Sequence, residues 1–394
     1  MTPLLAAAKH GYKQIVMILL ASGSIVYNIC KNISILIKWA FQDGNGDVIK
    51  ILTNCRDESE GSKYGWIPLI AATIDKQDTL VKLLISQGAN VNISDTDGMT
   101  PLSWACKLGH FEITKVLISE KANPNAFNLL RKTPLIYACQ NSNIDIVQLL
   151  LEIVAEVNSF DAEGDAPLHS ACKNGNRDIV RLLIQKGAEV NGYDVDGQTP
   201  LIMSCKNNNN DIVRLLIEKG ANINVSNSSG KSPITLSCEN DNSDIVRLLI
   251  EKGAEVNDDD IDGQTPLILS CKNNNNDIVR LLIEKGANIN VSNSSGKYPI
   301  ILSCENDNSD IVRLLIEKGA EVNVNDVDGQ TPLLLSSKND NIDIVLLLIE
   351  KGANVNVSNS SGKYPIILSC ENGNRDIVRL LIEKGAEVDV YDVD

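Results

Sequence analysis

Residues 196–224 read DGQTPLIMSCKNNNNDIVRLLIEKGANIN and contain the signals for two helices. Thr199 offers the hydroxyl of an N-cap, and Pro200 has the fixed φ of a first helical position. The sequence therefore predicts a short helix from Pro200 to about Lys206. Asn208 ends this helix, because asparagine tolerates the left-handed conformation.

A second helix follows in the same stretch. It begins near Asp211, whose carboxylate suits a helix N-terminus, and Gly220 ends it. Before the first helix, the polar run from Asp194 to Gln198 is typical of a turn, and Gly197 supplies the positive φ that a hairpin needs. One such helix pair is too small to bury its own apolar stripe, so it must stack on its neighbours.

The proline that opens the first helix recurs at a constant interval of 33 residues. A fixed period of this length is typical of stacked repeat proteins. The chain has 394 residues, of which 43% are hydrophobic and 4% aromatic, so a core of Leu, Ile, Val and Ala is expected. The recurring prolines are Pro68, Pro101, Pro134, Pro167, Pro200, Pro233, Pro266, Pro299, Pro332 and Pro365.

Three short stretches carry a family resemblance: GDAPLHSAC at residues 164–172, DGQTPLIMSC at 196–205 and DIVRLLIEKGANIN at 211–224. They resemble ankyrin repeats. The resemblance implies an all-α solenoid of antiparallel helix pairs with short β-hairpin fingers. It also implies a concave groove lined by the short helices and the fingers.

The resemblance covers essentially the whole chain, as about twelve tandem repeats. We expect one solenoid over residues 1–394. Residues 1–63 hold partly degenerate repeats, and residues 64–196 hold divergent ones. Residues 197–394 repeat almost identically every 66 residues, which is two units at a time.

Some positions depart from the family pattern. Arg131 replaces the finger glycine, and Lys121 and Val154 replace the glycine that ends the second helix. We therefore expect local irregularity around residues 121–160. Only His169 keeps the histidine that follows Pro-Leu in the family, where it supports the loops by hydrogen bonding.

The net charge of −15 opposes the phosphate contacts that dominate nucleic-acid binding and disfavours an anionic membrane surface. We expect no nucleic acid and no membrane insertion. No early apolar run is long enough for a secretory signal peptide. These observations predict a soluble, non-secreted chain. We also expect a monomer.

Eight of the ten cysteines fall five residues after a repeat proline. Equivalent positions in neighbouring repeats lie roughly 8–10 Å apart, whereas a disulfide needs Cα atoms within about 7 Å. We expect buried, reduced thiols and an intracellular, cytoplasmic location. These cysteines are Cys106, Cys139, Cys172, Cys205, Cys238, Cys271, Cys304 and Cys370.

No motif for catalysis, cofactor binding or metal binding is complete. Asp258, Asp260, Asp262 and Gly263 reproduce the first half of a calcium loop, but Leu269 stands where the bidentate Glu is required. The sequence contains no Cys-x-x-Cys pair, phosphate-binding loop or nucleophile elbow. We expect no enzyme activity, no catalytic residue, no metal and no cofactor.

The function implied by the resemblance is that of a non-catalytic scaffold or adaptor, which binds protein partners through the concave groove and the fingers. The alternative is a targeting arm or elastic spacer fragment of a larger protein whose effector domain is absent.

The partner-binding residues are expected mainly in the divergent part of the chain. Large apolar residues on fingers are typical of binding hot spots, unless they fold inward to repair degenerate repeats. Phe127 and Phe160 lie close to the groove positions implied there. Those positions are Tyr64, Trp66, Met99, Leu108, Leu129 and Leu130.

In the regular part, the implied groove residues include Asp196, Gln198 and Lys231. Because the same chemistry recurs every second repeat, this face suits a repetitive ligand that gains from multivalency. Its small polar side chains also suit a spacer.

Overall fold

The computed structural model describes residues 68–391 continuously, together with residues 3, 6, 7, 10, 12, 14, 15, 18 and 19. The chain forms two compact units, Met1–Val195 and Asp196–Asp394, called unit 1 and unit 2 below.

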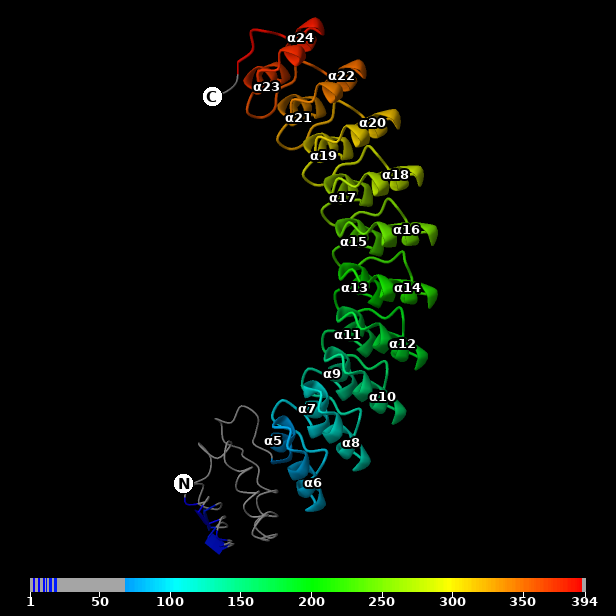
Figure 1. Cartoon of the computed structure of the whole chain (residues 1–394), viewed down its shortest axis with the longest axis vertical. Helices are drawn as coiled ribbons and strands as arrows, with labels where there is room; N and C mark the ends of the chain where they lie inside the picture. Colours follow the sequence, from blue (N-terminus) through cyan, green and yellow to red (C-terminus); the bar gives the residue numbers. More distant parts are fainter. Residues whose placement is uncertain are drawn as a thin grey trace. The chain divides into compact units, whose positions relative to one another are not determined.

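Residues 68–195 of unit 1 form four helix pairs, and each pair packs on the next (Figure 1). Every first helix opens with a repeat proline. The short first helices are α5 (Pro68–Ile74), α7 (Pro101–Leu108), α9 (Pro134–Gln140) and α11 (Pro167–Lys173). The second helices are α6 (Asp78–Ser86), α8 (Phe111–Ser119), α10 (Ile144–Glu152) and α12 (Arg177–Gln185).

Unit 2 contains six helix pairs of the same kind within its described residues. The first helices are α13 (Pro200–Lys206), α15 (Pro233–Glu239), α17 (Pro266–Lys272), α19 (Pro299–Glu305), α21 (Pro332–Lys338) and α23 (Pro365–Glu371). The second helices are α14 (Asn210–Glu218), α16 (Ser243–Glu251), α18 (Asn276–Glu284), α20 (Ser309–Glu317), α22 (Ile342–Glu350) and α24 (Arg375–Glu383). The predicted all-α solenoid is confirmed.

The helix ends lie where the sequence signals place them. The hydroxyl of Thr199 accepts a hydrogen bond from the backbone N of Ile202 at 3.2 Å and so caps α13. Asn208 follows that helix with a φ of +59°. Most second helices are capped instead by an asparagine side chain, as Asn275 caps α18 by accepting from the N of Ile278 at 3.0 Å.

The core of each unit is aliphatic and lies between the two helix layers. Seven of the eight repeat cysteines are buried as free thiols, as expected. Cys370 is a correction, because its side chain is exposed. In the earlier repeats of unit 2 a further helix pair packs on the helix that carries this cysteine, whereas within the described residues no helix pair follows α24.

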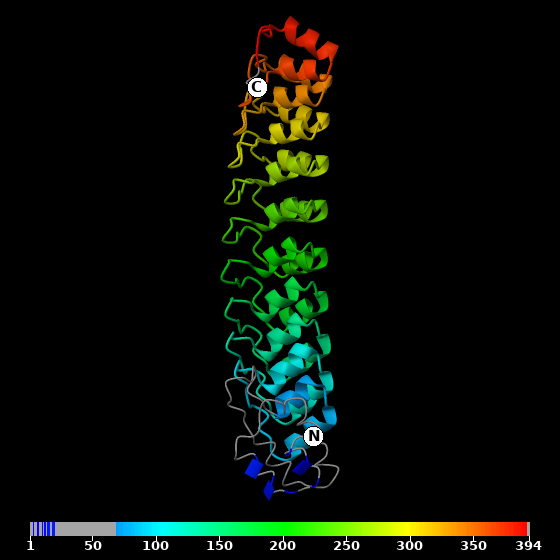
Figure 2. The same ribbon diagram turned by 90° about the vertical axis from the view of Figure 1, so that its left-hand side faces the viewer.

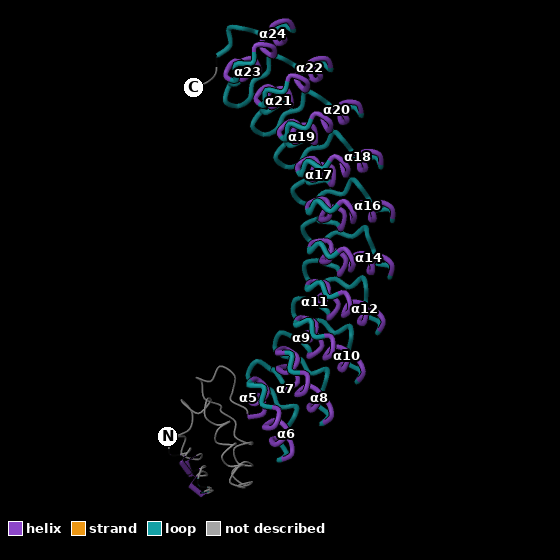
Figure 3. Tube along the Cα trace, in the orientation of Figure 1, coloured by secondary structure: helices purple, strands orange, loops and turns teal. Residues whose placement is uncertain are grey.

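The fingers project from one side of the helices in each unit (Figure 2). They are tight turns and not the expected β-hairpins, since no strand occurs among residues 68–391 (Figure 3). A side-chain oxygen of Asp or Asn closes most of these turns. In the first described finger, Oδ1 of Asp95 accepts from the backbone N atoms of Asp97 at 3.1 Å and Met99 at 2.8 Å.

The expected irregularity around residues 121–160 is absent from the backbone of these loops. Lys121, Arg131 and Val154 adopt φ values of +63°, +59° and +66° in place of glycine. The helix pairs therefore keep their register, and the three residues retain a conformation that disfavours a Cβ atom.

Asparagine side chains tie consecutive repeats together. In unit 2, Asn257 donates from Nδ2 to the carbonyl O of Gly286 at 3.2 Å and accepts on Oδ1 from the backbone N of Asn288 at 2.7 Å. Each such amide joins one repeat to the next. The same pair of bonds is made in this unit by Asn224, Asn290, Asn323 and Asn356.

Candidate partner-binding surface

The predicted site residues of unit 1 are only partly brought together. Leu129 and Leu130 are exposed at the tip of one finger, and Leu108 is exposed at the end of α7. Tyr64 and Trp66 lie outside the described residues. The exposed leucines are therefore the part of the predicted patch that the structure places at the surface.

Met99 is a correction, because its side chain is 3% exposed. Its sulfur lies 3.6 Å from Nδ2 of Asn128 in the next finger. The turn held by Asp95 directs Met99 inward, where it packs between consecutive repeats. Met99 supports the finger and offers no side-chain surface to a partner.

Two aromatic residues on consecutive short helices lie close to Lys107. Trp104 on α7 and Tyr137 on α9 are nearly buried. The ammonium of Lys107 lies 4.8 Å from the ring centroid of Trp104 and 5.6 Å from that of Tyr137. Lys107 thus places a positive charge over two aromatic faces.

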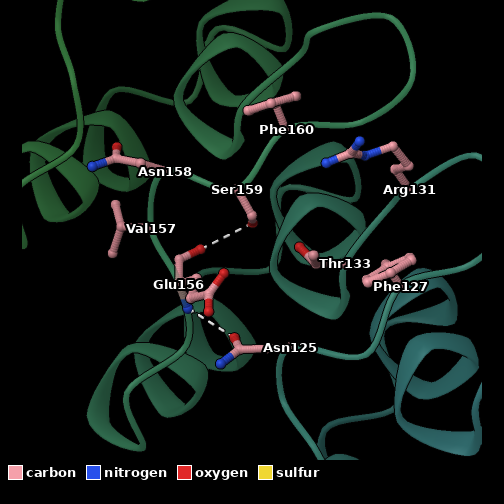
Figure 4. A pocket seen from close by; sticks show the side chains of 9 residues that line it. All are labelled: Asn125, Phe127, Arg131, Thr133, Glu156, Val157, Asn158, Ser159 and Phe160. Atoms are coloured by element: carbon pink, nitrogen blue, oxygen red, sulfur yellow. Dashed lines mark hydrogen bonds between the residues drawn. The ribbon is translucent and has the colours of Figure 1, made fainter.

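A surface pocket of about 610 Å³ lies between two consecutive fingers of unit 1. Figure 4 shows Arg131 beside Phe160, with Glu156 farther along the lining, next to Ser159. The guanidinium carbon of Arg131 is 5.0 Å from the ring centroid of Phe160. The lining is completed by Asn125, Phe127, Thr133, Val157, Asn158 and Ser159.

The two phenylalanines belong to a series that sequence reasoning found only in part. Phe127 and Phe160 occupy the same repeat position, and Tyr193 follows one repeat later. Their side chains are 65%, 52% and 74% exposed. The signal for Tyr193 was the 33-residue spacing itself, which places it in line with the two phenylalanines.

In unit 2, Asp196 is exposed, while Gln198 and Lys231 are half-buried. The ammonium of Lys231 pairs with the carboxylate of Glu239 at 2.7 Å. Two repeats further on, Lys297 pairs with both Glu305 and Asp326. The positive charges of these finger lysines are therefore matched by carboxylates of the same unit.

Known protein families include one with this repeat. A family model described as "Ankyrin repeats (3 copies)" matches residues 37–128, 127–194, 191–260, 255–326 and 321–392. A second, described as "Ankyrin repeat", matches residues 1–32. The chain belongs to the ankyrin-repeat family. Ankyrin repeats are in general protein-interaction modules, and proteins built from them are in general non-catalytic.

One curated relative of this ankyrin-repeat chain is the glycerophosphocholine phosphodiesterase GDE1 of Candida albicans. The two are 34% identical over 70 residues. This stretch is 17% of the ankyrin chain and 6% of the phosphodiesterase, so the chain spans a small part of that protein.

The buried thiols of the ankyrin repeats are poor nucleophiles. Burial raises the pKa of Cys205, Cys238, Cys271 and Cys304 to about 12, so each remains protonated near neutral pH. Within the described part of the chain, no group of three or more His, Cys, Asp or Glu side chains is arranged to hold a metal ion. Nor does any described helix combine the length and apolarity needed to cross a membrane.

His169 supports the loops as the family resemblance implies. Its Nδ1 accepts from the backbone N of Ala166 at 3.2 Å, and its Nε2 lies 3.1 Å from the carbonyl O of Gly192. The ring therefore links the start of α11 to the loop that leads into the next finger. Its role in this ankyrin repeat is structural.

Proposed function

We propose that this ankyrin-repeat chain is a non-catalytic scaffold or adaptor whose main partner-binding surface lies in unit 1, between residues 62 and 165. The observation that carries the proposal is the gathering of exposed apolar side chains on consecutive fingers there. Phe127, Leu129, Leu130 and Phe160 are all at least half exposed.

Exposed aromatic and large aliphatic side chains lose unfavourable contact with water when a partner covers them. Such residues dominate binding energy when they lie near the centre of an interface. The fingers bearing them are also rigid. Asn128 braces its finger by accepting on Oδ1 from the N atoms of Leu130 at 3.1 Å and Lys132 at 2.8 Å. The finger therefore loses little conformational freedom on binding.

The electrostatics favour a protein partner. A net charge of −15 repels the phosphates of nucleic acids and anionic lipids. The seven buried free thiols are consistent with a reducing intracellular compartment, and the cytoplasm is the proposed location. The chain is proposed to act as a monomer.

Unit 2 favours the second candidate function, a targeting arm or elastic spacer of a larger protein. Its fingers carry mostly small polar side chains, and the lysine of every second finger is paired with a glutamate, as Lys231 is with Glu239. On the fingers between residues 226 and 363, exposed aliphatic residues occur singly, at Ile261 and Val327. Such a surface offers few anchors for an interface core.

The experiment compares two surface changes of matched exposure in the full chain. Leu129, which is 74% exposed, and its neighbour Leu130 are both changed to Asp, and Ile261, which is 75% exposed, is changed to Asp in the control. Partners are captured from a lysate, and crosslinking maps the residues that they contact. We expect crosslinks near residues 108–160 that disappear in Leu129→Asp/Leu130→Asp and persist in Ile261→Asp.

Two results would contradict this assignment. Unchanged capture by the Leu129→Asp/Leu130→Asp variant would remove unit 1 as the binding surface. Loss of capture in Ile261→Asp would place binding on unit 2 and argue against its role as a spacer. Circular dichroism of each variant shows whether the helices are intact.

A further inference from the structure

The exposed aromatic series of unit 1 is absent from most of unit 2. Phe127, Phe160 and Tyr193, called the aromatic row below, occupy one repeat position in three consecutive repeats. An aromatic side chain returns to that position only at Tyr391. The residues between are Ser226, Asp259, Ser292, Asn325 and Ser358.

The aromatic row stands on fingers that touch each other. The backbone N of Ala162 donates to the carbonyl O of Leu130 at 2.9 Å, and the N of Val195 donates to the O of Glu163 at 3.0 Å. A Cβ atom on Gly164 would lie only 2.9 Å from the Cα of Asp194. These contacts fix the spacing of the row at one repeat, roughly 8–10 Å.

The space between the first two members of the row is the pocket of about 610 Å³, a volume within the range of ligand sites. Phe127 and Phe160 supply its aromatic lining (Figure 4). The guanidinium of Arg131 lies over the ring of Phe160 and brings N–H donors to the rim. The pocket thus combines apolar faces with groups that bond to peptide carbonyls.

Carboxylates follow the same period as the rings. Glu156 and Glu189 share one repeat position, and both are exposed. Glu156 lines the pocket between Phe127 and Phe160. With a net charge of −15 on the whole chain, this row of carboxylates attracts a basic ligand.

We propose that the aromatic row binds an extended, proline-rich segment of a protein partner that carries basic residues at every third position. A polyproline II helix has three residues per turn and rises about 9.3 Å per turn, which matches the spacing of the row. Its basic residues then share one edge and face Glu156 and Glu189, while its prolines pack on the rings. The inference rests on the proposed function, because it names the partner of the same surface.

An amphipathic helix fits this surface less well. Such a helix presents an apolar stripe at least about 100° wide. The aromatic row is a single line of side chains, and the pocket between Phe127 and Phe160 is also lined by Asn125, Glu156 and Asn158. A helix would press its apolar stripe onto these polar groups, whereas an extended segment alternates between the rings and the polar groups.

The test uses the full chain and a fluorescein-labelled peptide of four Pro-Pro-Arg triplets, with binding measured by fluorescence anisotropy. Two comparison peptides are four Gly-Gly-Arg triplets, which carry the same charge without the polyproline conformation, and an amphipathic Leu/Arg helix of equal charge. The variants are Phe127→Ala/Phe160→Ala and, as the matched control, Tyr391→Ala. Circular dichroism verifies that both variants keep their helices.

We expect the proline peptide to bind at least about tenfold more tightly than the glycine peptide, because stacking and a preformed conformation add to charge attraction. Phe127→Ala/Phe160→Ala should lower its affinity by about tenfold or more, and Tyr391→Ala should leave it unchanged. Equal binding of the proline and glycine peptides, or tighter binding of the helical peptide, would overturn the inference.

The lysate capture described above separates the two proposals. If none of the peptides binds, but capture still depends on Leu129 and Leu130, the proposed function stands and the proline-rich ligand is wrong. If capture is also independent of these leucines, both proposals fail.

Discussion

Trp104 and Asp95 are joined by a buried hydrogen bond, in which the indole Nε1 donates to Oδ2 across 2.8 Å. The other carboxylate oxygen of Asp95 closes the finger turn by accepting from the N atoms of Asp97 and Met99. The indole therefore fixes the finger to the short helix α7, and one carboxylate serves three donors.

The first prediction concerns this bond. Trp104→Phe leaves Oδ2 of Asp95 buried without a donor, so we expect a loss of about 1–3 kcal/mol in the free energy of unfolding. The control is Tyr137→Phe, which removes a neutral bond from Nδ2 of Asn128 at 3.0 Å and should cost about 0.5–1.5 kcal/mol. Urea unfolding followed by circular dichroism measures both, and equal losses would argue against a special role for the indole.

The helices were predictable because their signals are local. Thr199 and Pro200 define the start of α13, and Asn208 ends it in the left-handed conformation. These signals act within a few residues and do not depend on distant packing. The local signals did not predict the fingers correctly. An Asp or Asn side chain closes most of these turns, and the residues on either side do not pair as strands.

The second prediction concerns Ser337, which occupies the buried cysteine position of its repeat. Its Oγ is buried and has no hydrogen-bond partner. Ser337→Cys replaces a costly hydroxyl by a weakly polar thiol, so we expect a gain of about 1 kcal/mol in stability. The reverse change, Cys304→Ser, should cost a similar amount. Urea unfolding midpoints measure both, and a less stable Ser337→Cys variant would contradict this view.

The third prediction tests backbone strain at Val154, a β-branched residue with a φ of +66°. Val154→Gly should raise stability by about 1–2 kcal/mol, because the left-handed conformation is costly for residues other than glycine. Gly187→Val is the matched control at the same repeat position, where no atom lies within 4 Å of the added Cβ. It should destabilise by a similar amount. Thermal or urea unfolding gives both values, and a neutral pair would show that φ does not limit stability here.

The fourth prediction concerns the pH dependence of unit 2. Burial raises the pKa of Cys205, Cys238, Cys271 and Cys304 from 9.0 to about 12. As the pH rises, these thiols lose their protons in the unfolded chain before they do so in the folded one. The protonated thiols therefore contribute their full stability below pH 9, and this contribution is lost as the pH rises toward about 12. The urea concentration at the unfolding midpoint should therefore fall from pH 7 through pH 9 to pH 11.

A variant with these four cysteines changed to alanine provides the control for that pH series. Its midpoint should depend less on pH, because other groups that titrate in this range remain while the thiols are gone. An identical pH dependence in both proteins would exclude the thiols as its cause.

The candidate site was less predictable than the fold, since exposure depends on neighbouring repeats. Met99 and Leu129 are both apolar finger residues in the sequence, yet Met99 packs against Asn128 and Leu129 faces solvent. Cys370 shares its repeat position with seven buried cysteines and is exposed because no described helix pair follows it. Whether such a residue is buried or exposed depends on how the neighbouring repeats pack against it, which the local sequence does not reveal.

The asparagine amides of unit 2 have a mechanical consequence. Each one, such as Asn257, bridges only one repeat and its successor. Under tension applied along the stack, one repeat is freed when its amide bridge and the packing of its helices on the next pair are both broken, while the other repeats remain closed. Each rupture releases 33 residues, which extend to about 110 Å, so the unit lengthens in steps of one size.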